Sequence, residues 1–309
     1  MTLSDIRAHI KDIAPADEKS MHTAACVAAV EKLARSDQRI AAKMSDWNPD
    51  KMLLGAPRHT VDLRDSSLMD PIPTHMINKS TAVDPAESPT CLRWLKFLEE
   101  ATRGDQEFTD FLQRLCGYAL TGLTREQVLC FFYGPGGNGK SVFLNVLKGI
   151  AGSYGETAAI QTFMSSPYDP HLTGVAKLDG ARVVVASETE EGRKWRTSQI
   201  KVLTGGDPVA ARFMRQDEFE YLPQFLLMFV GNNAPELGKV DDAIKPRKCW
   251  IGILLDDVDV HEVVTQRKVE QVAEEVLCMN IIVLQVKAVQ MLNLHPQVRE
   301  IVRDTFYEV

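Results

Sequence analysis

The feature that most constrains this chain is one octapeptide, Gly134-Pro135-Gly136-Gly137-Asn138-Gly139-Lys140-Ser141. It matches the P-loop pattern G-x-x-x-x-G-K-[ST] at every fixed position. The apolar run 128–133 before it predicts a buried strand, and the apolar spacing of residues 142–150 predicts a helix after it. Glycines let backbone N–H groups converge on a phosphate, and the start of a helix adds partial positive charge. The octapeptide therefore predicts a binding site for a nucleoside triphosphate.

Two side chains of the octapeptide are expected to have specific roles. Lys140 would reach the β- and γ-phosphates of ATP, and the Ser141 hydroxyl would ligate Mg²⁺. The alternative is a glycine-rich turn that matches the pattern by chance. The strand expected before the turn and the helix expected after it argue against chance, because they supply the context that the motif requires.

Composition excludes several other classes of protein. The 309 residues carry a net charge of −7, so any contact with nucleic acid must come from a local basic patch. The six cysteines are scattered without a C-x-x-C pair, which indicates free thiols rather than a zinc site. The sequence begins without the pattern of a signal peptide and contains no apolar run of membrane-spanning length. We therefore expect a cytoplasmic protein with no membrane partner.

The hydrophobic pattern divides the chain into three segments. Residues 1–105 are expected to be mainly helical, although prolines interrupt residues 47–90 and a short strand is expected at 59–63. Residues 106–257 alternate strands with helices, which predicts an α/β domain around a parallel central sheet. Residues 258–309 predict a short helical tail. Further helices are expected at 92–98 and 108–120.

Two more apolar strands are expected to end in polar side chains. Residues 182–187 lead to Glu188 and Glu190, and residues 225–230 lead to Asn232. A P-loop ATPase needs a carboxylate beside the loop to hold Mg²⁺ or polarise the attacking water, and Glu188 is the best placed. An amide at a strand end can orient that water. The alternatives are a solvated acidic loop and a plain turn. If all three strands are parallel, their carboxyl ends meet in one crevice.

Between these two strands lies the most basic part of an acidic protein. Residues 209–222 predict a hairpin with Arg215 and Gln216 near its tip. The alternative is a solvated loop whose charges are balanced by neighbouring acids. Phosphate contact by such hairpins would allow this protein to hold DNA. The basic residues here are Arg193, Lys194, Arg196, Lys201, Arg212 and Arg215.

These motifs together resemble the superfamily 3 helicases, in particular the primase-associated group of phages and plasmids related to the poxvirus primase-helicase. The resemblance is carried by five stretches whose order and spacing match: residues 134–141, "ARVVVASETEE" (181–191), "IKVLTGGDPVAARFMR" (200–215), "VGNNAP" (230–235) and "VDDAI" (240–244).

The resemblance implies an AAA+-like P-loop ATPase that assembles into a hexameric ring and translocates on single-stranded DNA during replication. ATP would be hydrolysed between subunits. Glu188 would activate water, with assistance from Glu190 or Glu191, and Asn232 would sense the γ-phosphate. Arg215 and Gln216 would lie at the DNA-contacting hairpin, with Lys201 nearby. A separate primase or replication initiator is an expected partner.

The chain departs from the family pattern after residue 244. The family usually continues with several arginines, whereas this chain has Lys245-Pro246-Arg247, so Arg247 is the one candidate for an arginine finger. The alternative function is therefore a ring subunit that binds nucleotide but hydrolyses it weakly or not at all. A P-loop kinase is a third reading, which the hairpin and the Gly-Asn-Asn strand end argue against.

Overall fold

The computed structural model describes residues 23–37, 42–86, 92–134, 139–165, 172–187, 195–231 and 248–252. The chain divides into two compact units, Met1–Trp47 and Asn48–Val309. In the first unit, helix α2 (Ala24–Ser36) begins where the Thr23 hydroxyl accepts a hydrogen bond from the Cys26 N–H at 3.2 Å. A single 3-10 turn, η2 (Met44–Asp46), follows. Helix α2 confirms the helix expected in this part of the sequence.

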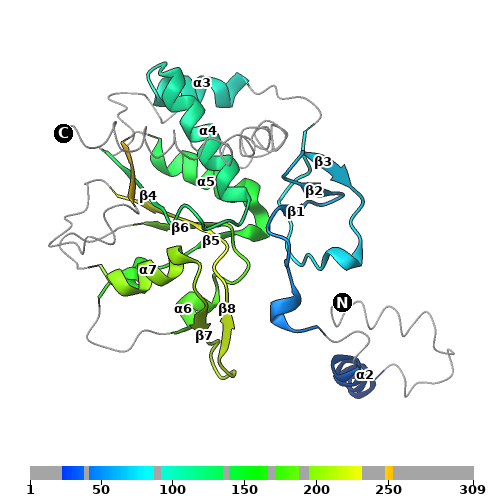
Figure 1. Ribbon diagram of the computed structural model, residues 1–309. Coiled ribbons are helices and arrows are strands. Elements are labelled where there is room, and N and C mark those ends of the chain that lie inside the picture. Colours follow the sequence, from blue (N-terminus) through cyan, green and yellow to red (C-terminus); the bar gives the residue numbers. More distant parts are fainter. Residues whose placement is uncertain are drawn as a thin grey trace. The chain divides into compact units, whose positions relative to one another are not determined.

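The second unit is built around a five-stranded sheet whose pairings are all parallel (Figure 1). The strand order is β10-β4-β9-β6-β5, which confirms the predicted parallel sheet. The strands are β4 (Leu129–Tyr133), β5 (Gly155–Thr157), β6 (Val183–Ser187), β9 (Leu226–Val230) and β10 (Lys248–Gly252). Strand β4, which leads into the P-loop, therefore lies between β10 and β9.

Helical layers cover both faces of this sheet (Figure 1). Helices α3 (Leu92–Ala101), α4 (Gln106–Leu120) and α5 (Lys140–Ala151) lie on one face. The other face carries α6 (Leu172–Ala176), α7 (Thr197–Gly205) and the hairpin of β7 (Val209–Ala211) and β8 (Phe219–Tyr221). Two 3-10 turns, η4 (Gly152–Tyr154) and η5 (Ile160–Phe163), flank β5. The helices expected at 92–98, 108–120 and 142–150 are confirmed.

The central strands are apolar throughout because alternate residues enter two different cores. Cys130 and Phe132 of β4 pack in the core beneath α4 and α5. Leu129 and Phe131 pack in the core on the opposite face, with α7 and the hairpin. Burial on both faces explains why these segments show continuous apolar runs rather than the alternation of a half-exposed strand.

A small antiparallel sheet precedes the helices of the second unit. Its strands are β1 (Leu53–Gly55), β2 (Thr60–Asp62) and β3 (Ser67–Met69), and the turn η3 (Pro73–His75) follows them. Strand β2 confirms the strand expected at 59–63. The sheet corrects the expectation of a mainly helical region before residue 105, because prolines interrupt helices here and Leu54 and Val61 supply buried strand positions.

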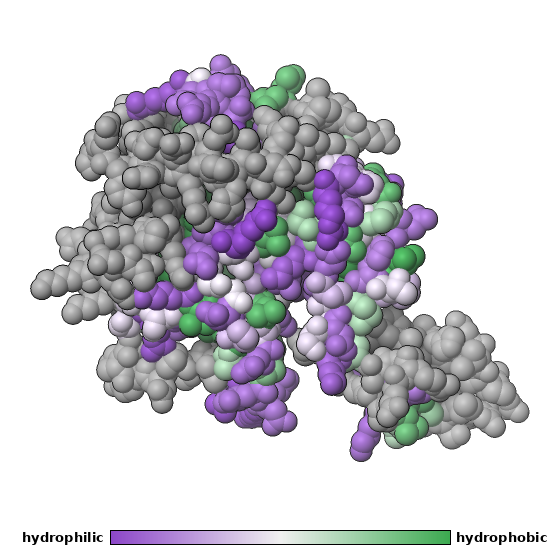
Figure 2. Space-filling view, viewed as in Figure 1, coloured by the Kyte–Doolittle hydropathy of each residue, from purple (hydrophilic) through white to green (hydrophobic). Residues whose placement is uncertain are grey.

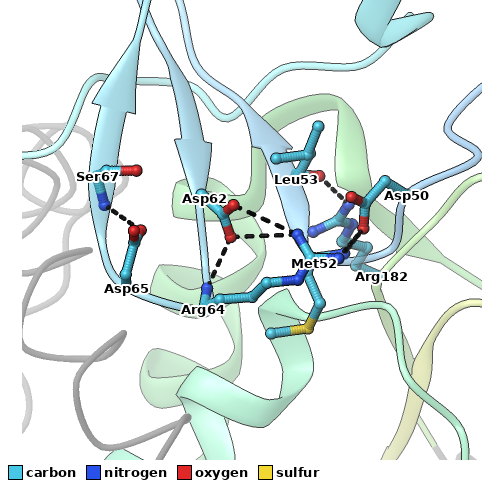
Figure 3. Close-up of polar contacts among 8 residues, drawn as sticks. All are labelled: Asp50, Met52, Leu53, Asp62, Arg64, Asp65, Ser67 and Arg182. Atoms are coloured by element: carbon cyan, nitrogen blue, oxygen red, sulfur yellow. Dashed lines mark hydrogen bonds and ion pairs between the residues drawn. The ribbon is translucent and has the colours of Figure 1, made fainter.

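A polar network joins this small sheet to the central one (Figure 3). The Asp50 carboxylate accepts hydrogen bonds from Arg64 Nη2 at 2.7 Å and from the Met52 N–H at 3.0 Å. Burial acts to raise the pKa of Asp50, but these hydrogen bonds and the Arg64 charge outweigh it and lower that pKa. Arg182 directly precedes β6 and donates from Nη2 to the Leu53 carbonyl at 2.5 Å. Contacts between distant parts of the sequence therefore fix β1 against the main sheet.

Candidate functional site

The candidate site lies where the central strands end. Phe132 of β4 lies beside Val230 of β9, and Val230 lies beside Ser187 of β6. Since these strands are parallel, the chain leaves all three at the same edge of the sheet. The Gly231 N–H, one residue past β9, donates to the Phe132 carbonyl at 3.0 Å. This hydrogen bond keeps the carboxyl ends of β9 and β4 aligned. Ligands of open α/β sheets bind at this kind of edge.

Two glycines of the P-loop are described, one on each side of residues 135–138. Gly134 follows β4 with φ 141°, and Gly139 has φ 82° immediately before α5 begins. L-amino acids with a Cβ atom rarely adopt such angles, so the backbone itself requires glycine at both ends. Residues 135–138 lie outside the described residues. The glycines at the two ends thus have a conformational reason that agrees with the motif.

Lys140 is the first residue of α5 and is only 4% exposed. Its Nζ donates to the Gly134 carbonyl at 2.7 Å, so the ammonium group folds back over the start of the loop. Burial lowers the pKa of Lys140. The ammonium group therefore lies between the end of β4 and the start of α5, where the P-loop motif predicts phosphate binding.

Ser141 occupies the first turn of α5 and is exposed. The N–H groups at the start of a helix lack intrahelical partners and attract anions. A buried ammonium group, an exposed hydroxyl and a helix N-terminus form a donor set that fits the phosphates of a nucleotide and an associated Mg²⁺. With a nucleotide bound, Lys140 would neutralise phosphate charge and Ser141 would offer an oxygen to the metal.

The remaining predicted catalytic residues follow the described strand ends. Ser187, exposed at the end of β6, directly precedes Glu188, and Gly231 directly precedes Asn232. The side chains of Glu188, Glu190, Asn232 and Arg247 lie outside the described residues. Their roles stay predictions, while the strands that lead to the acid and to the amide are confirmed.

Trp195 is a core-packing residue near the candidate site that sequence reasoning missed. Its ring packs edge-on against Phe229 at 4.7 Å and against Phe131 at 6.4 Å between centroids. Trp195 also forms an isolated antiparallel bridge with Met164. Ser187 at the end of β6 and Trp195 against the core are thus the described residues nearest to Glu188 on its two sides. A tryptophan at the end of a charged run was the signal that could have revealed this packing.

The predicted hairpin is confirmed as β7 and β8, which pair antiparallel from Val209 with Tyr221 to Ala211 with Phe219. Arg215 and Gln216 are exposed in the turn between these strands, and Arg215 has φ 62°. Lys201 is not part of this turn and lies half-buried on α7. Sequence reasoning assigned no helix there. The pair Gly205-Gly206 was an available signal, because Gly206 ends α7 in the left-handed conformation at φ 82°.

Two family models match the chain. Residues 6–103 match the family described as "D5 N terminal like". Residues 132–247 match the "Family of unknown function (DUF5906)". The second match covers the P-loop, the strands that lead to Glu188 and Asn232, and the hairpin. The two matches therefore fall on either side of the start of β4.

Three viral proteins are similar to parts of the chain. The "Putative helicase L207/L206" of Acanthamoeba polyphaga mimivirus is 27% identical over 143 residues, which are 45% of this chain and 15% of that protein. The "Putative helicase 184R" of Invertebrate iridescent virus 6 is 26% identical over 191 residues, which are 57% of this chain and 19% of that protein. The "Putative helicase 121R" of Invertebrate iridescent virus 3 is 25% identical over 51% of this chain and 17% of that protein. The chain thus spans less than a fifth of the length of these relatives.

Solved structures of the NrS-1 C-terminal region are also similar. An apo structure of residues 305–718 shares 17% identity, covers 72% of this chain and 53% of that chain, and has a TM-score of 0.48. An A form apo structure of the same region shares 16% identity, covers 67% and 49%, and has a TM-score of 0.46. Within the part of the chain that the structure describes, no helix has the length and apolarity needed to cross a membrane.

Proposed function

We propose that this chain is the ATPase part of a replicative DNA helicase of the superfamily 3 type, in the primase-associated group of phages and plasmids. The observation that carries the proposal is the common edge of β4, β9 and β6. It combines a P-loop lysine bonded to the Gly134 carbonyl at 2.7 Å with strand ends that lead to an acid and an amide. The similarity to proteins named as viral helicases supports the same activity.

The proposed site binds ATP with Mg²⁺. Lys140 and the N–H groups at the start of α5 hold the phosphates, and Ser141 offers its hydroxyl to the metal. Glu188 orients and polarises the attacking water, with assistance from Glu190 or Glu191, and Asn232 positions that water against the γ-phosphate. Arg247 of a neighbouring subunit stabilises the charge that develops on the transferred phosphate. The site is then complete only in an assembly, for which we propose a hexameric ring.

The proposed substrate is single-stranded DNA, which the hairpins of the ring contact in turn. A separate primase or replication initiator is the proposed partner that loads the ring. The D5-like match in residues 6–103 supports this assignment, because the resembled helicases carry a helical region before the ATPase segment.

One sequence observation favours a second function. Pro246 replaces a residue that is usually basic in the resembled family, which leaves Arg247 as the single candidate for the arginine finger. The second candidate is a ring subunit that binds ATP with little or no turnover. Restored hydrolysis in the Pro246→Arg variant would favour this second function over the first.

The proposal is tested by the rate of ATP hydrolysis with and without single-stranded DNA. We expect stimulation by DNA, and a loss of about 100-fold or more in the Lys140→Ala variant, because one charge-stabilising donor contributes that much to turnover. Lys148→Ala is the matched control, since Lys148 lies on the same helix and donates to the Thr157 hydroxyl at 2.8 Å, away from the loop. If the oligomeric protein hydrolyses no ATP in either condition, the proposal that the chain is a helicase is refuted.

A further inference from the structure

The β7–β8 hairpin is stiffened by a row of aromatic rings. Phe213 and Phe219 stack at 5.6 Å between centroids with planes 19° apart, and Phe219 contacts Tyr221 at 6.2 Å. The Tyr221 hydroxyl donates to the Val175 carbonyl of α6 at 2.8 Å. Because this row runs from the buried core toward the turn, the residues of the turn project from a rigid support.

The hairpin carries little positive charge for a surface expected to contact phosphates. Residues 207–221 contain four carboxylates and two guanidinium groups, and Figure 2 shows the end of the hairpin as mainly hydrophilic. Arg212 Nη1 forms an ion pair with Glu218 Oε1 at 3.7 Å. Among the described residues, none forms an ion pair with Arg215. Each hairpin therefore offers about one cation to a phosphate, and electrostatic attraction alone would give weak binding.

The turn exposes an apolar side chain beside that arginine. Met214 is 76% exposed, although a methionine ordinarily gains from burial. Its thioether is flexible and polarisable, and such groups contact the faces and edges of aromatic rings favourably. Nucleobases offer aromatic faces whatever the sequence, so an exposed methionine suits sequence-independent contact with them.

We infer that the hairpin grips single-stranded DNA by a base contact from Met214 together with a single phosphate contact from Arg215. This inference rests on the proposed function and adds the mode of recognition. The two contacts differ in their response to salt. The Arg215 contact weakens as salt rises because it releases counterions, whereas the Met214 contact does not depend on them.

The test measures affinity for an oligothymidylate over a series of salt concentrations, with a non-hydrolysable ATP analogue present. Met214→Ala should weaken binding by about two- to ten-fold at every salt concentration. Arg215→Gln should flatten the dependence of log K on log salt by about 0.7 for each hairpin that engages the strand. Leu222→Ala is the matched control, because Leu222 is an apolar residue that directly follows β8, 49% exposed and outside the turn.

A second oligonucleotide distinguishes contacts to the bases from contacts to the backbone. On an abasic strand of the same length, Met214→Ala should have no effect, while Arg215→Gln should act as before. If Met214→Ala binds oligothymidylate as tightly as the unmodified chain, the inference fails and the proposed helicase stands. If Met214→Ala alters only self-association of the protein, the turn is a protein contact and the inference is wrong. If no version binds single-stranded DNA, the proposed function fails as well.

Discussion

The two edges of the central sheet, the one where its parallel strands end and the one where they begin, differ in the groups that they carry. At the carboxyl edge, β4 leads into the P-loop and the described chain presents Lys140 beside the Gly134 carbonyl. At the amino edge, Arg182 is 1% exposed and donates to the carbonyls of Leu53 and Leu120. One edge holds a set of groups that fits a ligand, and the other ties together segments that are far apart in the sequence.

The amino edge is an anchor built around a buried guanidinium group. The Arg182 guanidinium lies over the Tyr154 ring at 4.6 Å from its centroid. The Tyr154 hydroxyl in turn accepts a hydrogen bond from the Gly55 N–H at 3.0 Å. Burial lowers the pKa of Arg182, the reverse of the shift that an ion pair would cause. The two edges should therefore respond differently to substitution. Substitutions at the carboxyl edge should affect activity, and substitutions at the amino edge should affect stability.

Removing the Arg182 anchor should have the largest effect on stability. We expect Arg182→Leu to lower the free energy of unfolding by about 3 kcal/mol, because it leaves two buried carbonyl groups without donors. Urea denaturation followed by circular dichroism measures this. Arg182→Lys is the matched control and should recover less than half of the loss, since an ammonium group cannot reproduce the forked geometry. Unchanged stability in Arg182→Leu would remove the distinction between the edges.

The far end of α5 gives a second test of the amino edge. Gly152 ends this helix with φ 57°, and a Cβ there would lie 2.4 Å from the Ala82 nitrogen and 2.6 Å from the Ser80 carbonyl oxygen. We expect Gly152→Ala to destabilise the protein by about 2 kcal/mol, from the left-handed backbone and from the overlap with backbone atoms.

Gly149 provides the control within the same helix. A Cβ at Gly149 would meet nothing within 4 Å, so Gly149→Ala should stabilise the protein by about 0.5–1 kcal/mol. Thermal melting of the two variants compares them directly. Equal shifts of the two melting temperatures in the same direction would contradict the tight packing of residues 80–82 against the end of α5.

The stability that the core between the two edges contributes should fall at alkaline pH. Burial raises the pKa of the Cys116 thiol on α4 from 9.0 to about 12. The unfolded chain therefore releases this proton first, and the stability contributed by the neutral thiol is lost as the pH rises from 9 toward 12.

Cys116→Ala isolates this effect. The difference in unfolding free energy between the unmodified chain and the variant should shrink by about 1.4 kcal/mol between neutral pH and about pH 10. Tyr118, whose pKa burial raises to about 12, is present in both proteins and cancels. Urea denaturation at the two pH values measures the difference, and a constant difference would show that the thiol is not shielded from water.

The sequence predicts the carboxyl edge far better than the amino edge. Gly134, Lys140 and the apolar strands are local signals, because each motif and its flanking strand or helix are contiguous in the chain. Arg182 gives no such signal: its partners Leu53 and Leu120 lie far from it in sequence, and an arginine at the start of an apolar strand ordinarily faces water. The antiparallel sheet was recognised only at β2, because strands of three residues show too little periodicity to be read individually.

The most direct test of the two-edge account is amide hydrogen exchange with and without ATP and Mg²⁺. We expect nucleotide to slow exchange in peptides that cover the junction of β4 and α5 and the carboxyl ends of β6 and β9. Peptides around Tyr154 and Arg182 should exchange at unchanged rates, and the Lys140→Ala variant should lose the protection. Protection centred on the Arg182 edge, or no protection anywhere at saturating nucleotide, would contradict the central claim that the P-loop edge is the nucleotide site.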